Sequence, residues 1–168
     1  MTKIKLTALP IIIFSAIIVL GSCNRKDREN ASTFSKSGIV MNAAQENNAA
    51  NTSTAVGTLS VTYNKGSKIL AYNFSWSGLT GPVTASHIHG LASAGFNAGI
   101  FQTFTLGQIV PCKVGGVAGP TSCGSYSGNL FIDGYAIKEQ DLLNGMYYVN
   151  IHTAAYGGGE IRGQITFN

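Results

Sequence analysis

The sequence predicts an all-β domain over residues 55–168, an antiparallel Greek-key-type β-sandwich or barrel of about seven or eight strands with one short helix. Three observations lead to this prediction. Short segments alternate polar and apolar residues with the period of two that is typical of strands. Gly and Asn turns separate these segments at close spacing. No long stretch of the domain shows a helical period.

The alternating segments are short and follow one another closely. The expected strands are residues 56–63, 68–76, 83–89, 100–106, 125–132, 146–152 and 160–167. The one expected helix is residues 137–143, which is amphipathic and is followed by the stop signal Asn144-Gly145. The large aromatic residues are expected in the core, and they are Phe74, Trp76, Phe101, Phe104, Phe131, Tyr147 and Phe167.

Residues 1–22 have the order of a bacterial secretion signal. Lys3 and Lys5 precede an apolar run over residues 6–20, and Leu20-Gly21-Ser22-Cys23 resembles a lipobox, which implies cleavage before Cys23 and its diacylation. The alternative is a short transmembrane anchor, although the run is shorter than the roughly 20 residues that span a bilayer. We therefore expect a lipid-anchored, extracytoplasmic protein of the bacterial cell envelope, at the outer membrane or the cell surface.

Residues 23–54 are polar and rich in Asn, Ser and Ala, and we expect them to form a flexible tether between the lipid and the domain. The remaining cysteines, Cys112 and Cys123, bracket a loop rich in Gly. An exported chain permits a disulfide between them. The alternative is a two-thiolate metal site, which the spacing disfavours, because zinc sites use much closer cysteine pairs.

The basic composition does not predict a nucleic-acid partner. Two of the eleven Lys and Arg leave with the signal, so nine remain against seven Asp and Glu, a net charge of +2. A basic stripe that could neutralise phosphates is not evident in the sequence. The expected partners are the membrane, through lipidated Cys23, and an unidentified envelope or extracellular molecule.

The three histidines lie in two of the expected strands. His87 and His89 are two apart, so their side chains share one face, and His152 ends a later strand. Two imidazoles on one strand and a third from a neighbouring strand suit copper or zinc. Glu160 and Arg162 are also two apart, and they are candidates for an ion pair that orients an imidazole. The alternative is that the histidines form structural hydrogen bonds at a strand edge.

Four motifs together resemble the CHRD domain. They are Ala85-Ser86-His87-Ile88-His89-Gly90, Asn97-Ala98-Gly99-Ile100-Phe101, residues 143–153 (LNGMYYVNIHT) and residues 159–165 (GEIRGQI). The resemblance implies an extracellular β-sandwich module, and the Cys112–Cys123 loop reads as an insertion into it. It implies little about biochemical role.

A more distant similarity is to the Cu/Zn superoxide dismutases. By that analogy His87, His89 and His152 would be copper ligands, and Arg162 would guide an anion. The sequence has no fourth histidine to bridge two metals and no His-rich zinc loop, so a dismutase is not expected.

Hydrolase motifs are not convincing either. Gly124-Ser125-Tyr126-Ser127-Gly128 has the outline of a nucleophile elbow, but Tyr126 stands in the nucleophile's place. We therefore expect no catalytic residues, and a non-catalytic binding or structural role in the envelope. The alternative function is copper or zinc binding by the three histidines.

Overall fold

The computed structural model describes residues 32–168 apart from 116 and 119. The predicted signal peptide, Cys23 and the first part of the predicted tether lie outside these residues. The strands are β1 (Thr33–Asn42), β2 (Val56–Asn64), β3 (Ile69–Ser77), β4 (Val83–Gly90), β5 (Ile100–Thr103), β6 (Val110–Pro111), β7 (Lys113–Val114), β8 (Val117–Ala118), β9 (Gly124–Phe131), β10 (Tyr147–Thr153) and β11 (Ile161–Gln164). The helices are the 3-10 helices η1 (Ala43–Gln45) and η2 (Leu106–Gln108) and the α-helix α2 (Glu139–Leu143). No helix among the described residues is long and apolar enough to cross a membrane.

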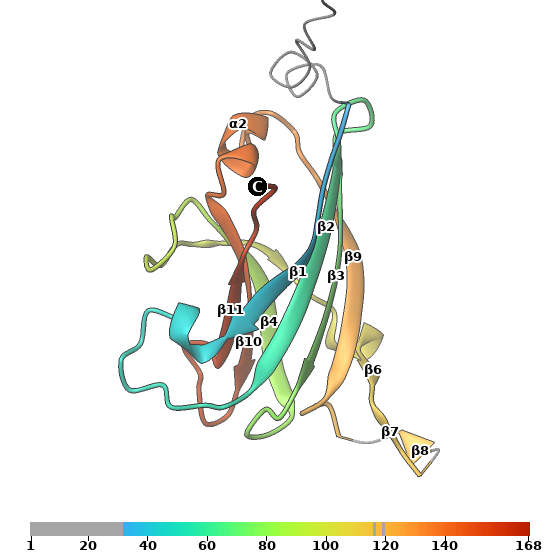
Figure 1. The fold of residues 1–168 in the computed structure, drawn as a ribbon, viewed down its shortest axis with the longest axis vertical. Helices are drawn as coiled ribbons and strands as arrows, with labels where there is room; N and C mark the ends of the chain where they lie inside the picture. The colour runs from blue at the N-terminus through green and yellow to red at the C-terminus, as the bar shows by residue number, and fades with distance from the viewer. Residues whose placement is uncertain (1–31, 116, 119) are drawn as a thin grey trace, which may run out of the picture. The chain divides into compact units, whose positions relative to one another are not determined.

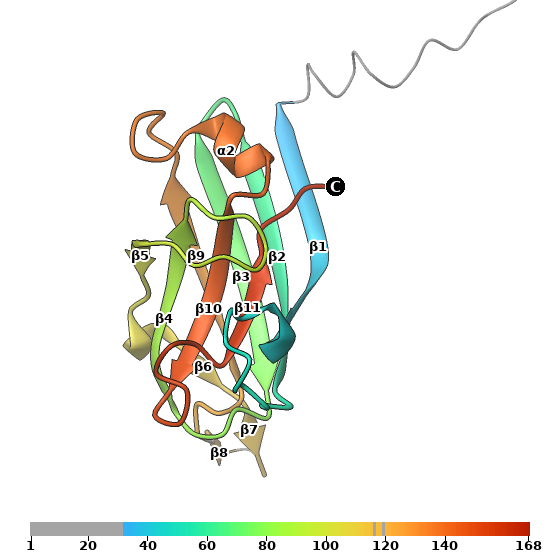
Figure 2. The same cartoon turned by 90° about the vertical axis from the view of Figure 1, so that its left-hand side faces the viewer.

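Nine of the strands form one curled antiparallel sheet in the order β5-β4-β10-β11-β1-β2-β3-β9-β6. The sheet folds into two layers, with β1, β2, β3 and β9 side by side in one and β4, β10 and β11 in the other (Figures 1 and 2). The layers join through a single register pair between β1 and β11, Asn42 with Arg162. This confirms the prediction of an all-β antiparallel fold.

β1 lies at the centre of the strand order, within the segment that the sequence predicts to be a tether. Eight register pairs join β1 to β2, and Met41 of β1 is completely buried. The tether prediction is therefore wrong for residues 33–54, which fold with the domain. The pairing shifts between Lys36 and Ile39, around Gly38 with φ +72°. A bulge reverses which residues face inward, so the alternation that marks a strand is interrupted.

The core between the layers contains the inward residues of β2 and β3 together with those of β4, β10 and β11 from the other layer. Tyr72, Phe74 and Phe104 pack with ring centroids 5.3–6.4 Å apart. Each buried ring of this size contributes on the order of 2 kcal/mol. Phe131 contradicts its prediction, because it is 55% exposed. Phe131 lies on the outward side of β9 with Ser127 and Asn129, because every second residue of a strand points to the same side.

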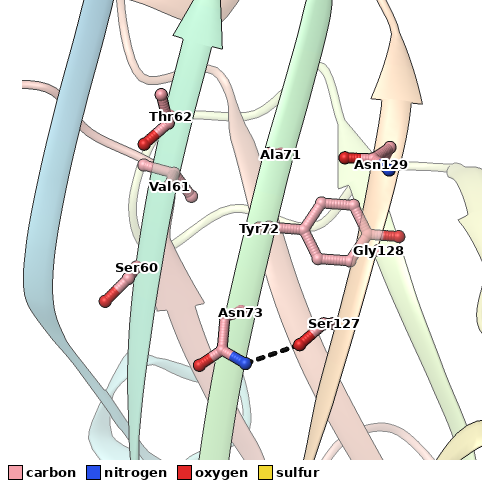
Figure 3. Close-up of a pocket in the computed structure, with 9 residues that line it drawn as sticks. All are labelled: Ser60, Val61, Thr62, Ala71, Tyr72, Asn73, Ser127, Gly128 and Asn129. Carbon is pink, nitrogen blue, oxygen red and sulfur yellow. Dashed lines mark hydrogen bonds between the residues drawn. The ribbon is translucent and has the colours of Figure 1, made fainter.

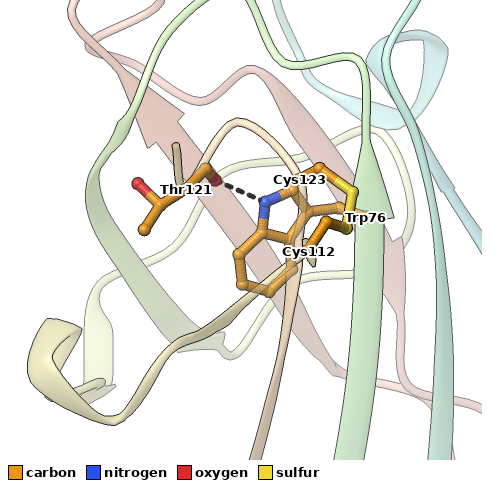
Figure 4. The surroundings of a disulfide bond; sticks show 4 residues. All are labelled: Trp76, Cys112, Thr121 and Cys123. Carbon is orange, nitrogen blue, oxygen red and sulfur yellow. Dashed lines mark hydrogen bonds between the residues drawn. A yellow bond between two sulfur atoms is a disulfide. The ribbon is translucent and has the colours of Figure 1, made fainter. Parts of the chain in front are cut away.

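The disulfide between Cys112 and Cys123 is present, as predicted, with Cα atoms 5.4 Å apart (Figure 4). The backbone amide of Cys112 also donates to the carbonyl of Cys123 at 3.0 Å. Beside the bridge, the indole Nε1 of buried Trp76 donates to the carbonyl of Thr121 at 2.8 Å. The loop is therefore attached to the core at its base by the bridge and by Trp76.

Candidate functional site

A layer of polar side chains covers the outward face of β4, β10 and β11. Register pairs place Tyr148 opposite His89 and Asn150 opposite His87 and Arg162, so these side chains share one face of the sheet. The opposite face carries Ile88, Val149 and the other core residues. We call the outward set the polar layer, and it comprises His87, His89, Tyr148, Asn150, His152, Arg162 and Gln164.

The polar layer is buried although it faces outward, and only His87 within it is partly exposed. Loops on this side of the sheet supply its hydrogen-bond partners. The loop of residues 91–99 offers the carbonyls of Ala92, Phe96 and Ala98, and the turn after β10 offers that of Gly157. Buried polar groups require such partners, so these loops and the layer fold as one unit.

The three histidines of the polar layer meet at one place. One ring nitrogen from each of His87, His89 and His152 lies within 4.8 Å of the other two. His87 Nδ1 and His152 Nε2 are 3.0 Å apart. The strand spacing therefore brings together the three residues that the sequence singles out.

Backbone carbonyls fix which nitrogens of two rings are free. His89 Nδ1 lies 2.9 Å from the carbonyl of Ala98, and His152 Nδ1 lies 3.0 Å from that of Gly157. A carbonyl only accepts, so in the neutral rings both Nδ1 atoms carry the proton and both Nε2 atoms present a lone pair. In this tautomer the Nε2 of His152 accepts from His87 Nδ1 at 3.0 Å, whereas Asn150 Oδ1, also 3.0 Å away, is itself an acceptor and supplies no proton to it. The Nε2 of His89 is buried and has no hydrogen-bond partner among the described residues.

The electrostatics of the cluster favour neutral imidazoles. Burial, and then the charges of His152 and His89, lower the pKa of His87 to about 4. Burial also lowers the pKa of His152, against the hydrogen bond to Gly157. Both rings are therefore uncharged at neutral pH, and the neutral imidazole is the form that ligates metals.

Arg162 lies behind the cluster and is completely buried. Its guanidinium carbon lies 3.3 Å from the centre of the Tyr148 ring, and His89 stacks on Tyr148 with centroids 4.8 Å apart and planes 5° from parallel. Because β10 lies between β4 and β11, the Tyr148 ring separates His89 from Arg162. Arg162 also donates to the carbonyl of Phe96 at 2.8 Å, and so it holds the 91–99 loop against the polar layer.

The suggested Glu160–Arg162 ion pair does not form. Glu160 instead accepts hydrogen bonds from the hydroxyls of Ser53, Thr80 and Thr153 and from the amide of Thr80. Burial alone would raise the pKa of Glu160, but these hydrogen bonds outweigh it and hold the pKa below its usual value. Glu160 therefore connects the segments around Ser53 and Thr80 to the end of β10, and no contact joins it to an imidazole among the described hydrogen bonds.

Glu46 is the acidic residue whose charge interacts with that of Arg162, and the sequence did not predict it as part of the site. Burial raises its pKa to about 7, against the attraction of Arg162 and a hydrogen bond with Asn150. Its Oε1 is buried, and the described part of the chain offers it no hydrogen-bond partner. A Cβ on Gly159, whose φ is +127°, would overlap this carboxylate. Glu46 lies in the supposed tether, so no local signal marked it.

A separate shallow depression lies on the outward face of β2, β3 and β9, with a volume of about 380 Å³. Its polar side chains are small, and Asn73 donates to Ser127 at 2.6 Å (Figure 3). No acidic, basic or imidazole side chain lines it. The three histidines and Arg162 lie elsewhere, in the polar layer in the other half of the sheet.

The comparisons with known proteins agree with the motifs of the sequence. The family model described as the CHRD domain matches residues 38–165, and so includes β1 from Gly38 onward. No significant match to the chain was found among the curated proteins or among the solved structures. The match supports a domain module of a non-enzymatic type.

Proposed function

This chain belongs to the CHRD domain family, and from that premise we propose that it is a lipid-anchored, non-catalytic module of the bacterial envelope that binds copper or zinc through His87, His89 and His152. The observation that carries the metal proposal is the Nε2 atom of His89. Within residues 32–168, apart from 116 and 119, this buried lone pair has no partner, and leaving such an atom unsatisfied costs about 1–3 kcal/mol. A metal ion would satisfy it.

The donor set suits these metals by number and type. The proposed donors are His87 Nδ1, His89 Nε2 and His152 Nε2, one ring nitrogen from each histidine of the cluster, and zinc and copper both accept imidazole ligands at about 2.0–2.1 Å. Two donors on one ion lie at most about 4 Å apart at that bond length. Separations of up to 4.8 Å therefore require at most a small side-chain movement. When a metal binds, the proton on His87 Nδ1, which bonds to His152, would move to Nε2 of the same partly exposed ring.

The competing function is structural. His87 and His152 already bond to each other, and two carbonyls hold His89 and His152. A cluster of this kind can position the 91–99 loop without a metal, in a module that binds an envelope or extracellular partner. This alternative leaves the buried Nε2 of His89 unexplained, which is why we favour metal binding.

The location proposal rests on the lipobox-like residues 20–23, with Cys23 as the acylated residue. The Cys112–Cys123 disulfide supports an oxidising compartment. Mass spectrometry of the protein from a bacterial membrane tests the anchor. The account predicts a diacylated N-terminal cysteine in the wild type and an uncleaved, soluble or mislocalised chain in Cys23→Ser.

Isothermal titration tests the metal site, using the chain from residue 24 onward with Cu(II), Cu(I) and Zn(II). The proposal predicts one tightly bound ion per chain, and its loss in His89→Ala. Asn73→Ala is the control. It removes a polar side chain from the exposed side of the other layer, and it should bind the metal as the wild type does. Equal metal binding by the wild type and His89→Ala, or no binding by either, would contradict the metal site and favour the structural role of the histidines.

A further inference from the structure

The end of the domain where β1 begins is built from three segments that are distant in the sequence (Figures 1 and 2). They are the start of β1, the turn between β2 and β3, and the loop between β9 and α2. The amide of Lys65 donates to the carbonyl of Ser32 at 2.8 Å, and the amide of Ile132 donates to the carbonyl of Lys68 at 2.8 Å. We call this surface the β1 end, comprising residues 32–34, 64–68 and 131–138.

Two aromatic side chains project from the β1 end into solvent. Tyr135 is 88% exposed and Phe131 is 55% exposed. The carboxylate of Asp133 accepts hydrogen bonds from the amides of Tyr135 at 2.8 Å and of Ile137 at 3.0 Å. The loop thus has a defined turn that directs Tyr135 outward, while Ile137 and Ile132 beside it are buried. Exposed aromatic side chains next to an ordered turn are suited to insertion at a surface.

We propose that the β1 end docks on the phospholipid bilayer that holds the lipid of Cys23, with Tyr135 and Phe131 in the headgroup region. This inference rests on the anchor in the proposed function. Nine residues, 24–32, separate Cys23 from β1, and they span at most about 30 Å when fully extended. A tether of that length keeps the β1 end near the bilayer at an effective concentration of the order of millimolar, so weak contacts suffice.

The chemistry of the β1 end favours docking through aromatic side chains in the headgroup region, and it does not favour electrostatic attraction to anionic lipid. Its lysines are Lys65, Lys68 and Lys138, and the acidic residues beside them are Asp133, Glu139 and Asp141. Lys65 is also paired with Glu139 at 3.4 Å. Positive and negative charges therefore balance, whereas Tyr is a side chain enriched where membrane meets water. Docking should depend only weakly on salt.

Fluorescence quenching by brominated lipids tests this inference in the full-length, acylated protein. The vesicles would contain phosphatidylethanolamine and phosphatidylglycerol, part of it brominated on the acyl chains. Tyr135→Trp places the probe at the β1 end. Val110→Trp, 64% exposed in β6 far along the sheet, is the matched control. The native Trp76 is buried in both and supplies a constant background.

The inference predicts quenching of Tyr135→Trp that exceeds that of Val110→Trp by about twofold, since interfacial aromatic residues lie next to the acyl chains. Equal quenching of the two variants overturns it. A blue shift of Tyr135→Trp that grows with protein concentration in the chain from residue 24 onward, which has no acyl chains, also overturns it, because a second copy then covers the surface.

Failure of the docking and failure of the anchor give different results. If the protein carries acyl chains and floats with the vesicles but Tyr135→Trp is not quenched, the anchor stands and the docking is wrong. If mass spectrometry finds no acyl chains, the anchor is wrong and the docking falls with it. The chain from residue 24 onward, which has neither the signal nor the acylated cysteine, should show no quenching with the same vesicles, because without the lipid the aromatic contacts are too weak to hold the domain.

Discussion

His87 and His152 lie on neighbouring strands with His87 Nδ1 and His152 Nε2 only 3.0 Å apart. His152 Nδ1 donates to the carbonyl of Gly157, so its Nε2 must accept, and the proton between the two rings belongs to His87. A second proton between these rings would turn one of them into an imidazolium and place a positive charge in a partly buried site. Acid and a metal ion therefore compete for the same nitrogens, and this competition makes the site testable.

The metal-free domain should lose stability in acid because of His87. Its pKa is about 4 when folded, against 6.5 for the ordinary side chain, so between these pH values the unfolded chain binds protons that the folded chain does not. The free energy of unfolding should be largest above pH about 6.5 and fall as the pH drops toward about 4. Urea unfolding with a chelator present measures this. A shallower slope is expected in His87→Asn, and an unchanged slope would refute the assignment.

Glu46 should act in the opposite direction. Burial raises its pKa from 4.5 to about 7, so the stability associated with its neutral form is complete below pH about 4.5 and is lost as the pH rises through about 7. Glu46→Gln removes this loss. The variant should gain stability relative to the wild type across that interval, by an amount of the order of 3 kcal/mol at most. The same urea series measures it, and a difference that does not vary with pH would contradict the prediction.

Arg162 should hold the 91–99 loop. Arg162→Gln removes hydrogen bonds to the carbonyls of Phe96 and Ser93 and the contact with Tyr148, and it should cost about 3 kcal/mol of stability. Hydrogen exchange should accelerate at the amide of Ala98, which donates to the Tyr148 hydroxyl. Lys138→Gln, which removes an exposed cation, is the control. Equal exchange in both variants would mean that the loop does not depend on Arg162.

The Cys112–Cys123 bridge should stabilise the domain by about 3 kcal/mol, mainly by restricting the unfolded chain. The double variant Cys112→Ser, Cys123→Ser should lower the free energy of unfolding by that amount. Trp76 reports the local effect, because its indole bonds to Thr121 inside the closed loop. A shift of its emission together with the lost stability is the expected result, and unchanged stability would show that the loop is fixed without the bridge.

The sequence predicts much of this fold because alternation is a local property. In β3, Leu70, Tyr72, Phe74 and Trp76 are inward and buried, as their spacing predicts. The same alternation does not reveal β1, because the bulge at Gly38 interrupts it. Before the bulge the even-numbered Phe34 faces inward, and after it the odd-numbered Ile39 and Met41 do. A chain that begins at residue 50 lacks this strand and should fail to fold, whereas one that begins at residue 32 should fold.

The site is predictable only in part, for a similar reason. His87, His89 and His152 share a face because strand geometry dictates it, once β4 and β10 pair. The partners of Arg162 come instead from loops, and Glu46 is more than a hundred residues from Arg162 in the chain. Contacts between loops carry no local period, so the suggestion of a Glu160–Arg162 pair rested on sequence spacing and was wrong.

The most direct test of the metal proposal is an anomalous difference map from crystals of the domain grown with copper or zinc. The account predicts one peak about 2 Å from each of His87 Nδ1, His89 Nε2 and His152 Nε2. A peak at any other position, or a metal-free cluster with His87 and His152 still bonded to each other at saturating metal, would contradict it.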